Sequence, residues 1–144
     1  MDPLLFLTQA QRLAATAAEE DWRTATSRAY YAAFHVARVF LTNLGFTVPN
    51  AERAHAYLWL RLQNCGEPTV QQAGVILNDL RRQRTWADYD LSHSFVKTRA
   101  QAAVQDATRL IQILNAVVEP TRTQVMNAMK DYERLVLQDV TWHP

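Results

Sequence analysis

The feature that most constrains the fold is one long helical pattern, from Asp21 to Leu44. Apolar residues recur there every three or four positions, as on one side of a helix turning about 100° per residue. Together they cover nearly half of the helix surface: Trp22, Ala29, Tyr30, Ala33, Phe34, Val36, Ala37, Phe40, Leu41 and Leu44. So broad a face needs several packing partners, which predicts a central helix. Asp21 is expected to cap its start, and Gly45 suits its end.

Weaker helical patterns fill the rest of the chain. Only three glycines and five prolines interrupt 144 residues, which argues against a β-rich fold. A first helix is expected to begin at Asp2-Pro3, and a third to run from Ala51 to Gln63. Thr69 is expected to cap a fourth helix. A fifth would begin at Ser92 or Ser94 and end before Pro120, and a sixth would pass through Val125 and Val136. Residues 141–144 are expected to be a frayed tail.

These elements predict an all-α fold. The expected architecture is an antiparallel up-and-down helical bundle with about four or five core helices and a C-terminal helix. The length fits a single domain spanning residues 1–144. Within it, residues 119–144 are expected to form an appended helix and tail.

Composition excludes several classes of protein. Fifteen basic and 14 acidic residues leave a net charge of +1, so there is no strongly basic nucleic-acid-binding tail. Cys65 is alone, which excludes an intrachain disulfide and a thiolate metal cluster. The N-terminus lacks a signal-peptide pattern, and no apolar run approaches about 20 residues, so we expect a cytoplasmic protein without a membrane span. Phosphate-loop, zinc-protease and serine-hydrolase motifs are missing, and the four histidines lack metal-ligand spacing, so we expect no cofactor.

A polar stripe on the long helix is the first candidate site. It falls within about 80° of the helix circumference and contains Arg28, Tyr31, His35, Arg38 and Thr42. Residues 22–38 carry three positive charges and no negative one, so an anionic partner would suit this face. The alternative is an ordinary solvent-facing stripe or a hydrogen-bonded dimer seam.

The second candidate is the segment from Arg81 to Arg99, interpreted as irregular. It contains five basic residues, two acidic residues and three interleaved rings: Arg81, Arg82, Arg84, Lys97 and Arg99; Asp88 and Asp90; Trp86, Tyr89 and His93. Basic groups among aromatic rings can hold phosphates and stack on bases. The alternative is that Arg84 and Asp88 form only a structural ion pair.

Two segments carry a recognisable signature: Ser-Arg-Ala-Tyr-Tyr-Ala-Ala-Phe-His at 27–35 and Arg-Thr-Trp-Ala-Asp-Tyr at 84–89. They resemble the HEPN superfamily (higher eukaryotes and prokaryotes nucleotide-binding), in particular its small stand-alone bacterial and archaeal branch. A helix beginning near His55 lies between them, also in keeping with that branch. The resemblance spans roughly residues 4–118.

The resemblance implies a helical bundle that is usually a homodimer, with a polar cleft at the subunit interface. Many members are metal-independent RNases of toxin–antitoxin and defence systems, with an Arg followed after four to six residues by a His. The His would move a proton at the RNA 2′-hydroxyl, and the Arg would stabilise the phosphorane. Here eight residues separate Arg84 from His93, whereas six separate Arg28 from His35 on the earlier helix. The spacing therefore does not decide whether the chain is a metal-independent endoribonuclease.

The expected function is a HEPN-like component of a toxin–antitoxin or defence-type module that binds or cleaves RNA, or binds nucleotides. The alternative is a catalytically silent dimerisation or partner-binding module, such as the partner of a minimal nucleotidyltransferase. For cleavage, Arg84 and Arg28 would bind phosphate and His93 or His35 would transfer the proton. The other expected RNA- or nucleotide-binding residues are Tyr31, Arg38, Arg81, Arg82, Asp88 and Tyr89, with Asp88 and Tyr89 in positioning roles and Tyr89 also a candidate nucleotidylation target.

The two hypotheses differ in the geometry they expect. Convergence of the candidate residues on one solvent-open cleft would favour the functional hypothesis: Arg28, His35, Arg84, Asp88 and His93. Burial of Asp88 in a closed ion pair with an arginine would favour the structural one.

Overall fold

The computed structural model describes all 144 residues, and all of its secondary-structure elements are helices, as predicted. Six α-helices are followed by a π-helical turn: α1 Leu4–Ala14, α2 Glu19–Leu44, α3 Arg53–Gln63, α4 Pro68–Tyr89, α5 Lys97–Asn115, α6 Thr121–Tyr132 and η1 Glu133–Leu137. None of the helices is both long and apolar enough to cross a membrane.

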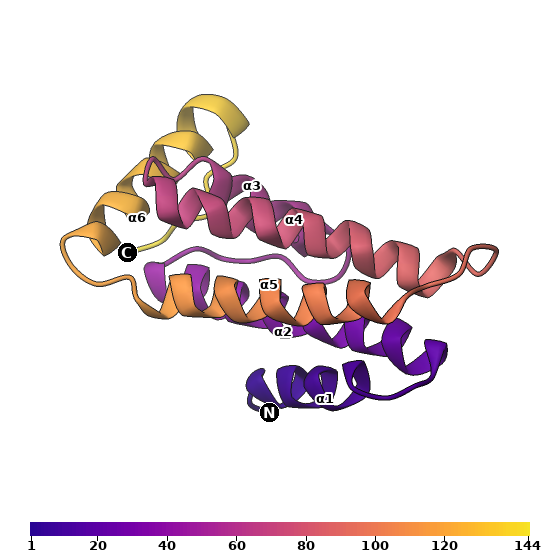
Figure 1. Cartoon of the computed structure of the whole chain (residues 1–144). Coiled ribbons are helices and arrows are strands. Elements are labelled where there is room, and N and C mark those ends of the chain that lie inside the picture. The colour runs from indigo at the N-terminus through magenta and orange to yellow at the C-terminus, as the bar shows by residue number, and fades with distance from the viewer.

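Helix α2 is the centre of the bundle, which confirms the main expectation from the sequence. It packs against α1 on one side and against α4 and α5 on the other (Figure 1). Small side chains let these neighbours approach closely, and five alanines of α2 are completely buried: Ala25, Ala29, Ala32, Ala33 and Ala37. The alanine periodicity therefore marks helix–helix contact on several sides of α2.

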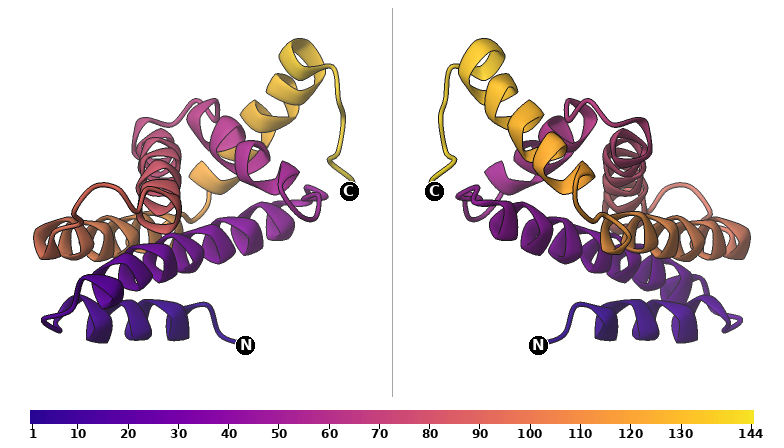
Figure 2. Two further views of the ribbon diagram at one scale, coloured as in Figure 1. Left: turned by 90° about the vertical axis from the view of Figure 1, so that its right-hand side faces the viewer. Right: turned by 90° about the vertical axis from the view of Figure 1, so that its left-hand side faces the viewer.

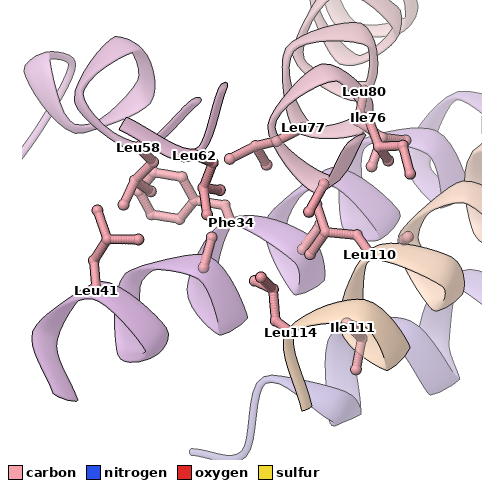
Figure 3. Packing of buried hydrophobic residues seen from close by; sticks show 14 of the residues in the cluster. Phe34, Leu41, Leu58, Leu62, Ile76, Leu77, Leu80, Leu110, Ile111 and Leu114 are labelled. Atoms are coloured by element: carbon pink, nitrogen blue, oxygen red, sulfur yellow. The ribbon is translucent and has the colours of Figure 1, made fainter. Parts of the chain in front are cut away.

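The hydrophobic core fills the space between α2, α3, α4 and α5. Figure 3 shows larger side chains of this core on these helices: Phe34, Leu41, Leu58, Leu62, Ile76, Leu77, Leu80, Leu110, Ile111 and Leu114. Burying each such side chain contributes roughly 1.5–3 kcal/mol to stability. Gly74 permits close contact of α3 and α4, because a Cβ there would lie 2.7 Å from the backbone nitrogen of Gln63.

Several helix starts differ from the sequence prediction. Helix α2 begins at Glu19, and Asp21 lies in its first turn, accepting a 2.8 Å hydrogen bond from the Thr16 hydroxyl instead of capping the helix. Helix α3 begins at Arg53 rather than Ala51, because Ala51 adopts a left-handed conformation with φ of 61°. The end of α2 is as predicted, since Gly45 has φ of 108°.

The interpretation of residues 81–99 as irregular is wrong for its first half. Helix α4 continues to Tyr89, and only residues 90–96 are non-helical. The pattern is obscured because Arg84 occupies an inward position of α4 that an apolar residue would normally fill. Glu67, not Thr69, caps α4 by accepting a 2.7 Å hydrogen bond from the Val70 amide. Neither Ser92 nor Ser94 caps α5.

The C-terminal tail is packed and not frayed. Helix α6 is inclined to the bundle, and the chain after η1 turns back toward the connection between α2 and α3 (Figure 2). There Trp142 pairs with Phe46 in an isolated β-bridge, and its indole Nε1–H donates to the Leu44 carbonyl at 2.8 Å. Sequence periodicity carries no signal for this pairing, because it joins residues far apart in the chain.

Candidate functional site

A cluster of polar side chains lies where α2, α3 and α4 meet. Ring contacts, hydrogen bonds and an ion pair join its members, which we call the central polar cluster: Ser27, Tyr30 and Tyr31 from α2, His55 from α3, and Arg84 and Asp88 from α4. The spacing of three or four residues within each helix turns these side chains toward the same junction.

Tyr30 and His55 form the buried base of the cluster. Tyr30 is completely buried, its hydroxyl is hydrogen-bonded to His55 Nδ1, and the two rings stack with centroids 5.6 Å apart. Burial raises the pKa of Tyr30 far above its usual value, despite the opposing charge of Arg84. Burial also lowers the pKa of His55, an effect that Arg84 and Arg81 reinforce and Glu52 opposes. Both side chains are therefore neutral at physiological pH.

Arg84 supplies the positive charge. It is only 9% exposed, and its guanidinium carbon lies 5.6 Å and 5.7 Å from the ring centroids of Tyr30 and Tyr31. These cation–π contacts stabilise the charge but use none of the five N–H donors. The buried Nε–H has no hydrogen-bond partner. Arg84 thus keeps donor capacity that the folded chain does not use.

Asp88 lies at the edge of the cluster and remains in contact with solvent. Its Oδ2 lies 3.8 Å from Arg84 Nη1, beyond hydrogen-bond distance, and accepts a 3.3 Å hydrogen bond from the Ser27 hydroxyl. The Asp88 side chain is 32% exposed. The Arg84–Asp88 ion pair is thus present, but it is open to solvent.

Arg28 and His35 lie on the side of α2 that faces α1, and both contact Phe6. The Arg28 guanidinium is 5.4 Å from the Phe6 centroid, and the His35 ring stacks on Phe6 at 5.6 Å. Burial lowers the pKa of His35, and Arg38 adds to the effect. Tyr31, a member of the central polar cluster, connects it to this group, with its ring centroid 6.4 Å from His35 and 6.5 Å from His55.

The remaining predicted arginines have different surroundings. Arg38 donates to the carbonyls of Val48 and Pro49 and to Asn50 Oδ1, at 3.0–3.4 Å, and so tethers the connection between α2 and α3. Arg82 is exposed and pairs with Asp79 at 3.3 Å. Arg81 is partly buried, and its charge acts on Tyr30 and His55. Of these three, Arg81 adds positive charge to the cluster.

His93 and Tyr89 lie at the exposed end of α4. The His93 side chain is 72% exposed, and its Nδ1 is 3.0 Å from Asp90 Oδ2, a contact that lowers the pKa of Asp90. Tyr89 is 73% exposed. No hydrogen bond, ion pair or ring contact joins His93 to Arg84. The predicted residues thus form separate groups: Arg84 with Asp88, Arg28 with His35, and His93 with Asp90.

Sequence reasoning missed three members of the cluster as site residues: Ser27, Tyr30 and His55. Tyr30 has the spacing of a core residue, and His55 is a single histidine on a different helix. The available signal is chemical, since a buried tyrosine hydroxyl needs a hydrogen-bond partner that apolar neighbours cannot supply. No three His, Cys, Asp or Glu side chains are grouped so that they could hold a metal ion.

Comparison with known proteins identifies the family. The HEPN domain model matches residues 5–135, which include the whole central polar cluster, all of α2 to α6, and α1 except its first residue. The chain therefore belongs to the HEPN domain family, and this membership indicates a function related to nucleotides or RNA. Comparison with curated proteins and with solved structures gave no significant match.

Proposed function

We propose that this chain binds RNA or a nucleotide through a phosphate at the central polar cluster. In this proposal it acts in the cytoplasm as a HEPN component of a toxin–antitoxin or defence-type module. The observation that carries the proposal is Arg84, a buried guanidinium with unused donors beside an edge open to solvent. Arginine's planar fork suits phosphate oxygens, and its unpaired Nε–H has no competing partner within the protein.

The surroundings of Arg84 support an anionic ligand. Arg81 adds a second positive charge close to the cluster, and the neighbouring His55 is neutral. The only carboxylate paired with Arg84 is Asp88, at 3.8 Å and partly exposed. Tyr31 is partly buried and offers ring surface next to Arg84 for a base or sugar. Arg28 and His35 extend this surface along α2.

RNA cleavage is a further step of the proposal. Arg84 and Arg28 would bind the phosphate, and His35 or His93 would transfer the proton, with Asp88 and Tyr89 as positioning residues. His93 is accessible and held by Asp90, whereas His35 lies on the Arg28 side of Tyr31.

The binding test compares two arginines on the same helix. A labelled single-stranded RNA and a nucleoside triphosphate are titrated into the wild type, Arg84→Ala and Arg82→Ala. A hydrogen bond to a charged group contributes about 1.5–3 kcal/mol, so Arg84→Ala should weaken binding by about 10- to 150-fold. Arg82→Ala should change binding by less than about twofold, because its exposed pair with Asp79 lies outside the cluster. Unchanged affinity of a folded Arg84→Ala variant would contradict the proposal.

The cleavage test uses purified protein, RNA and a chelator of divalent metals. The proposal expects cleavage without metal and its loss in the His35→Ala/His93→Ala double variant. Persistent cleavage by that variant would exclude both histidines as the proton-transfer group.

A second candidate function is a catalytically silent dimerisation or partner-binding module, such as the partner of a minimal nucleotidyltransferase. Arg38 favours it, because the hydrogen bonds of this arginine all go to the α2–α3 connection, so it has a structural role in place of the predicted ligand-binding one. The exposed Tyr89 would be accessible to a modifying partner. On this hypothesis Arg28→Ala lowers the stability of the homodimer in analytical ultracentrifugation, and none of the variants changes RNA or nucleotide binding, because there is none.

A further inference from the structure

We infer that Tyr30 fixes the tautomer of His55, so that a neutral imidazole presents its Nε2–H to the phosphate bound at Arg84. His55 is then a second ligand-binding residue and Tyr30 a positioning residue. This inference rests on the proposed phosphate site, and it assigns His55 a role different from proton abstraction.

The direction of the Tyr30–His55 hydrogen bond follows from burial. The Tyr30 hydroxyl is completely buried, and His55 Nδ1 is its one hydrogen-bond partner. If Nδ1 donated to the hydroxyl oxygen, the phenolic proton would have no acceptor, because the nearby Arg84 guanidinium has only donors. A buried donor without a partner costs about 1–3 kcal/mol. Tyr30 therefore donates, and Nδ1 accepts.

The charges around His55 keep the ring from taking a second proton. From α4, Arg84 and Arg81 lower its pKa in addition to the effect of burial. From the start of α3, Glu52 acts in the opposite direction, but its Oε2 lies 3.9 Å from Nε2 and its side chain is 88% exposed. The packed neighbours from α2, Tyr30, Tyr31 and Phe34, are uncharged rings. The single imidazole proton is accordingly on Nε2.

A donor at Nε2 has a chemical consequence. It can hydrogen-bond an oxygen of a phosphate held at Arg84, because His55 and Arg84 both pack against the Tyr30 ring. The exposed Glu52 carboxylate, 3.9 Å from Nε2, moves away as the anion arrives. The same nitrogen has no free lone pair, so it cannot accept a proton from a 2′-hydroxyl. Within the central polar cluster, His55 therefore binds and orients the ligand.

The tautomer is measured first, without ligand. Long-range proton–nitrogen NMR spectra of protein with ¹⁵N-labelled histidine should show His55 with a protonated Nε2 and an unprotonated Nδ1. Tyr30→Phe removes the donor to Nδ1 and should change this pattern. Tyr57→Phe is the matched control, because it also removes a buried tyrosine hydroxyl, one that is bonded to Thr141 and not to His55. A Nδ1–H tautomer, a doubly protonated ring, or an unchanged pattern in a folded Tyr30→Phe variant would overturn the inference.

The ligand role is measured second, with inorganic phosphate, a nucleoside monophosphate and a short RNA as probes. His55→Gln keeps an amide donor near the position of Nε2 and should bind within about threefold of the wild type, whereas His55→Leu should bind about tenfold more weakly. Wild-type affinity in a folded His55→Leu variant would overturn the role of His55. If no probe binds the wild type, the phosphate site itself fails, an outcome separate from the tautomer result.

Discussion

Glu133 is the most deeply buried charged side chain of the molecule. It is completely inaccessible and pairs with Arg61, whose Nε and Nη2 both lie 2.8 Å from Glu133 Oε2. The amide nitrogens of Thr141 and Trp142 also donate to it, at 3.0 Å and 3.2 Å. A buried carboxylate with this many donors is well compensated. Glu133 therefore holds the C-terminal tail against α3.

Removal of this carboxylate should destabilise the fold strongly. Glu133→Ala leaves Arg61 as an uncompensated buried charge, so the free energy of unfolding should fall by about 3–5 kcal/mol in urea denaturation. Asp131→Ala is the matched control, because Asp131 pairs with Arg134 at 2.9 Å on the surface. That variant should change stability by less than about 1 kcal/mol. Equal effects of the two substitutions would contradict the role of Glu133.

At the scale of elements, Arg23 connects α2 to the end of α4. Its guanidinium donates to the carbonyls of Ala87, Asp90 and His93 at 2.9, 2.8 and 2.6 Å. Glu19 completes the arrangement by accepting hydrogen bonds from Arg23 and from the Phe95 amide, which lower the pKa of Glu19. The last carbonyls of a helix lack partners within it, so Arg23 satisfies the one at Ala87 and also holds two carbonyls of the segment after α4.

Loss of this arrangement should loosen the segment that follows the site. In Arg23→Ala, amide hydrogen exchange of residues 90–95 should accelerate by about tenfold, since each lost hydrogen bond contributes about 1 kcal/mol. Arg12→Ala, on the exposed face of α1, should leave exchange in this segment unchanged. Unchanged exchange in Arg23→Ala would show that other contacts hold the connection between α4 and α5.

The elements also show where sequence reasoning succeeds and where it stops. The periodicity of α2 predicts the central helix, because almost every inward position is Ala, Leu or an aromatic residue. The same reasoning ends α4 too early, because Arg84 and Asp88 are polar groups whose partners come from α2. Local composition predicts Arg84 and Asp88 as site residues, and the polar stripe of the long helix predicts Tyr31. The Tyr30–His55 hydrogen bond joins residues 25 positions apart and needs the tertiary structure.

At the scale of the whole molecule, two histidines link stability to pH: His55, which is buried, and His35, which is partly buried. Burial lowers the pKa of both His35 and His55 below the ordinary 6.5. Below that pH the unfolded chain binds protons that the folded chain excludes, so stability is full above about pH 6.5 and falls on acidification. This contribution has the same sign for both residues.

The prediction is a loss of stability between about pH 7.5 and pH 5.5 that these two histidines cause in part. In urea denaturation at both pH values, the His35→Gln/His55→Gln double variant should lose less stability on acidification than the wild type. His143→Gln, which alters an exposed histidine without an ion-pair partner, should lose as much as the wild type. An equal loss of stability on acidification in all three proteins would contradict the role of the two histidines and assign the pH dependence to carboxylates.

Phosphate binding by Arg84 can be observed directly at the Nε–H that has no partner in the free protein. In a proton–nitrogen spectrum of ¹⁵N-arginine-labelled protein, Arg84→Lys assigns this resonance by its disappearance. On addition of a nucleotide or a short RNA, the resonance should move downfield and exchange more slowly with water, because a phosphate oxygen becomes its acceptor. A saturating ligand that shifts other arginines but leaves the Arg84 Nε–H unchanged would contradict the proposed site.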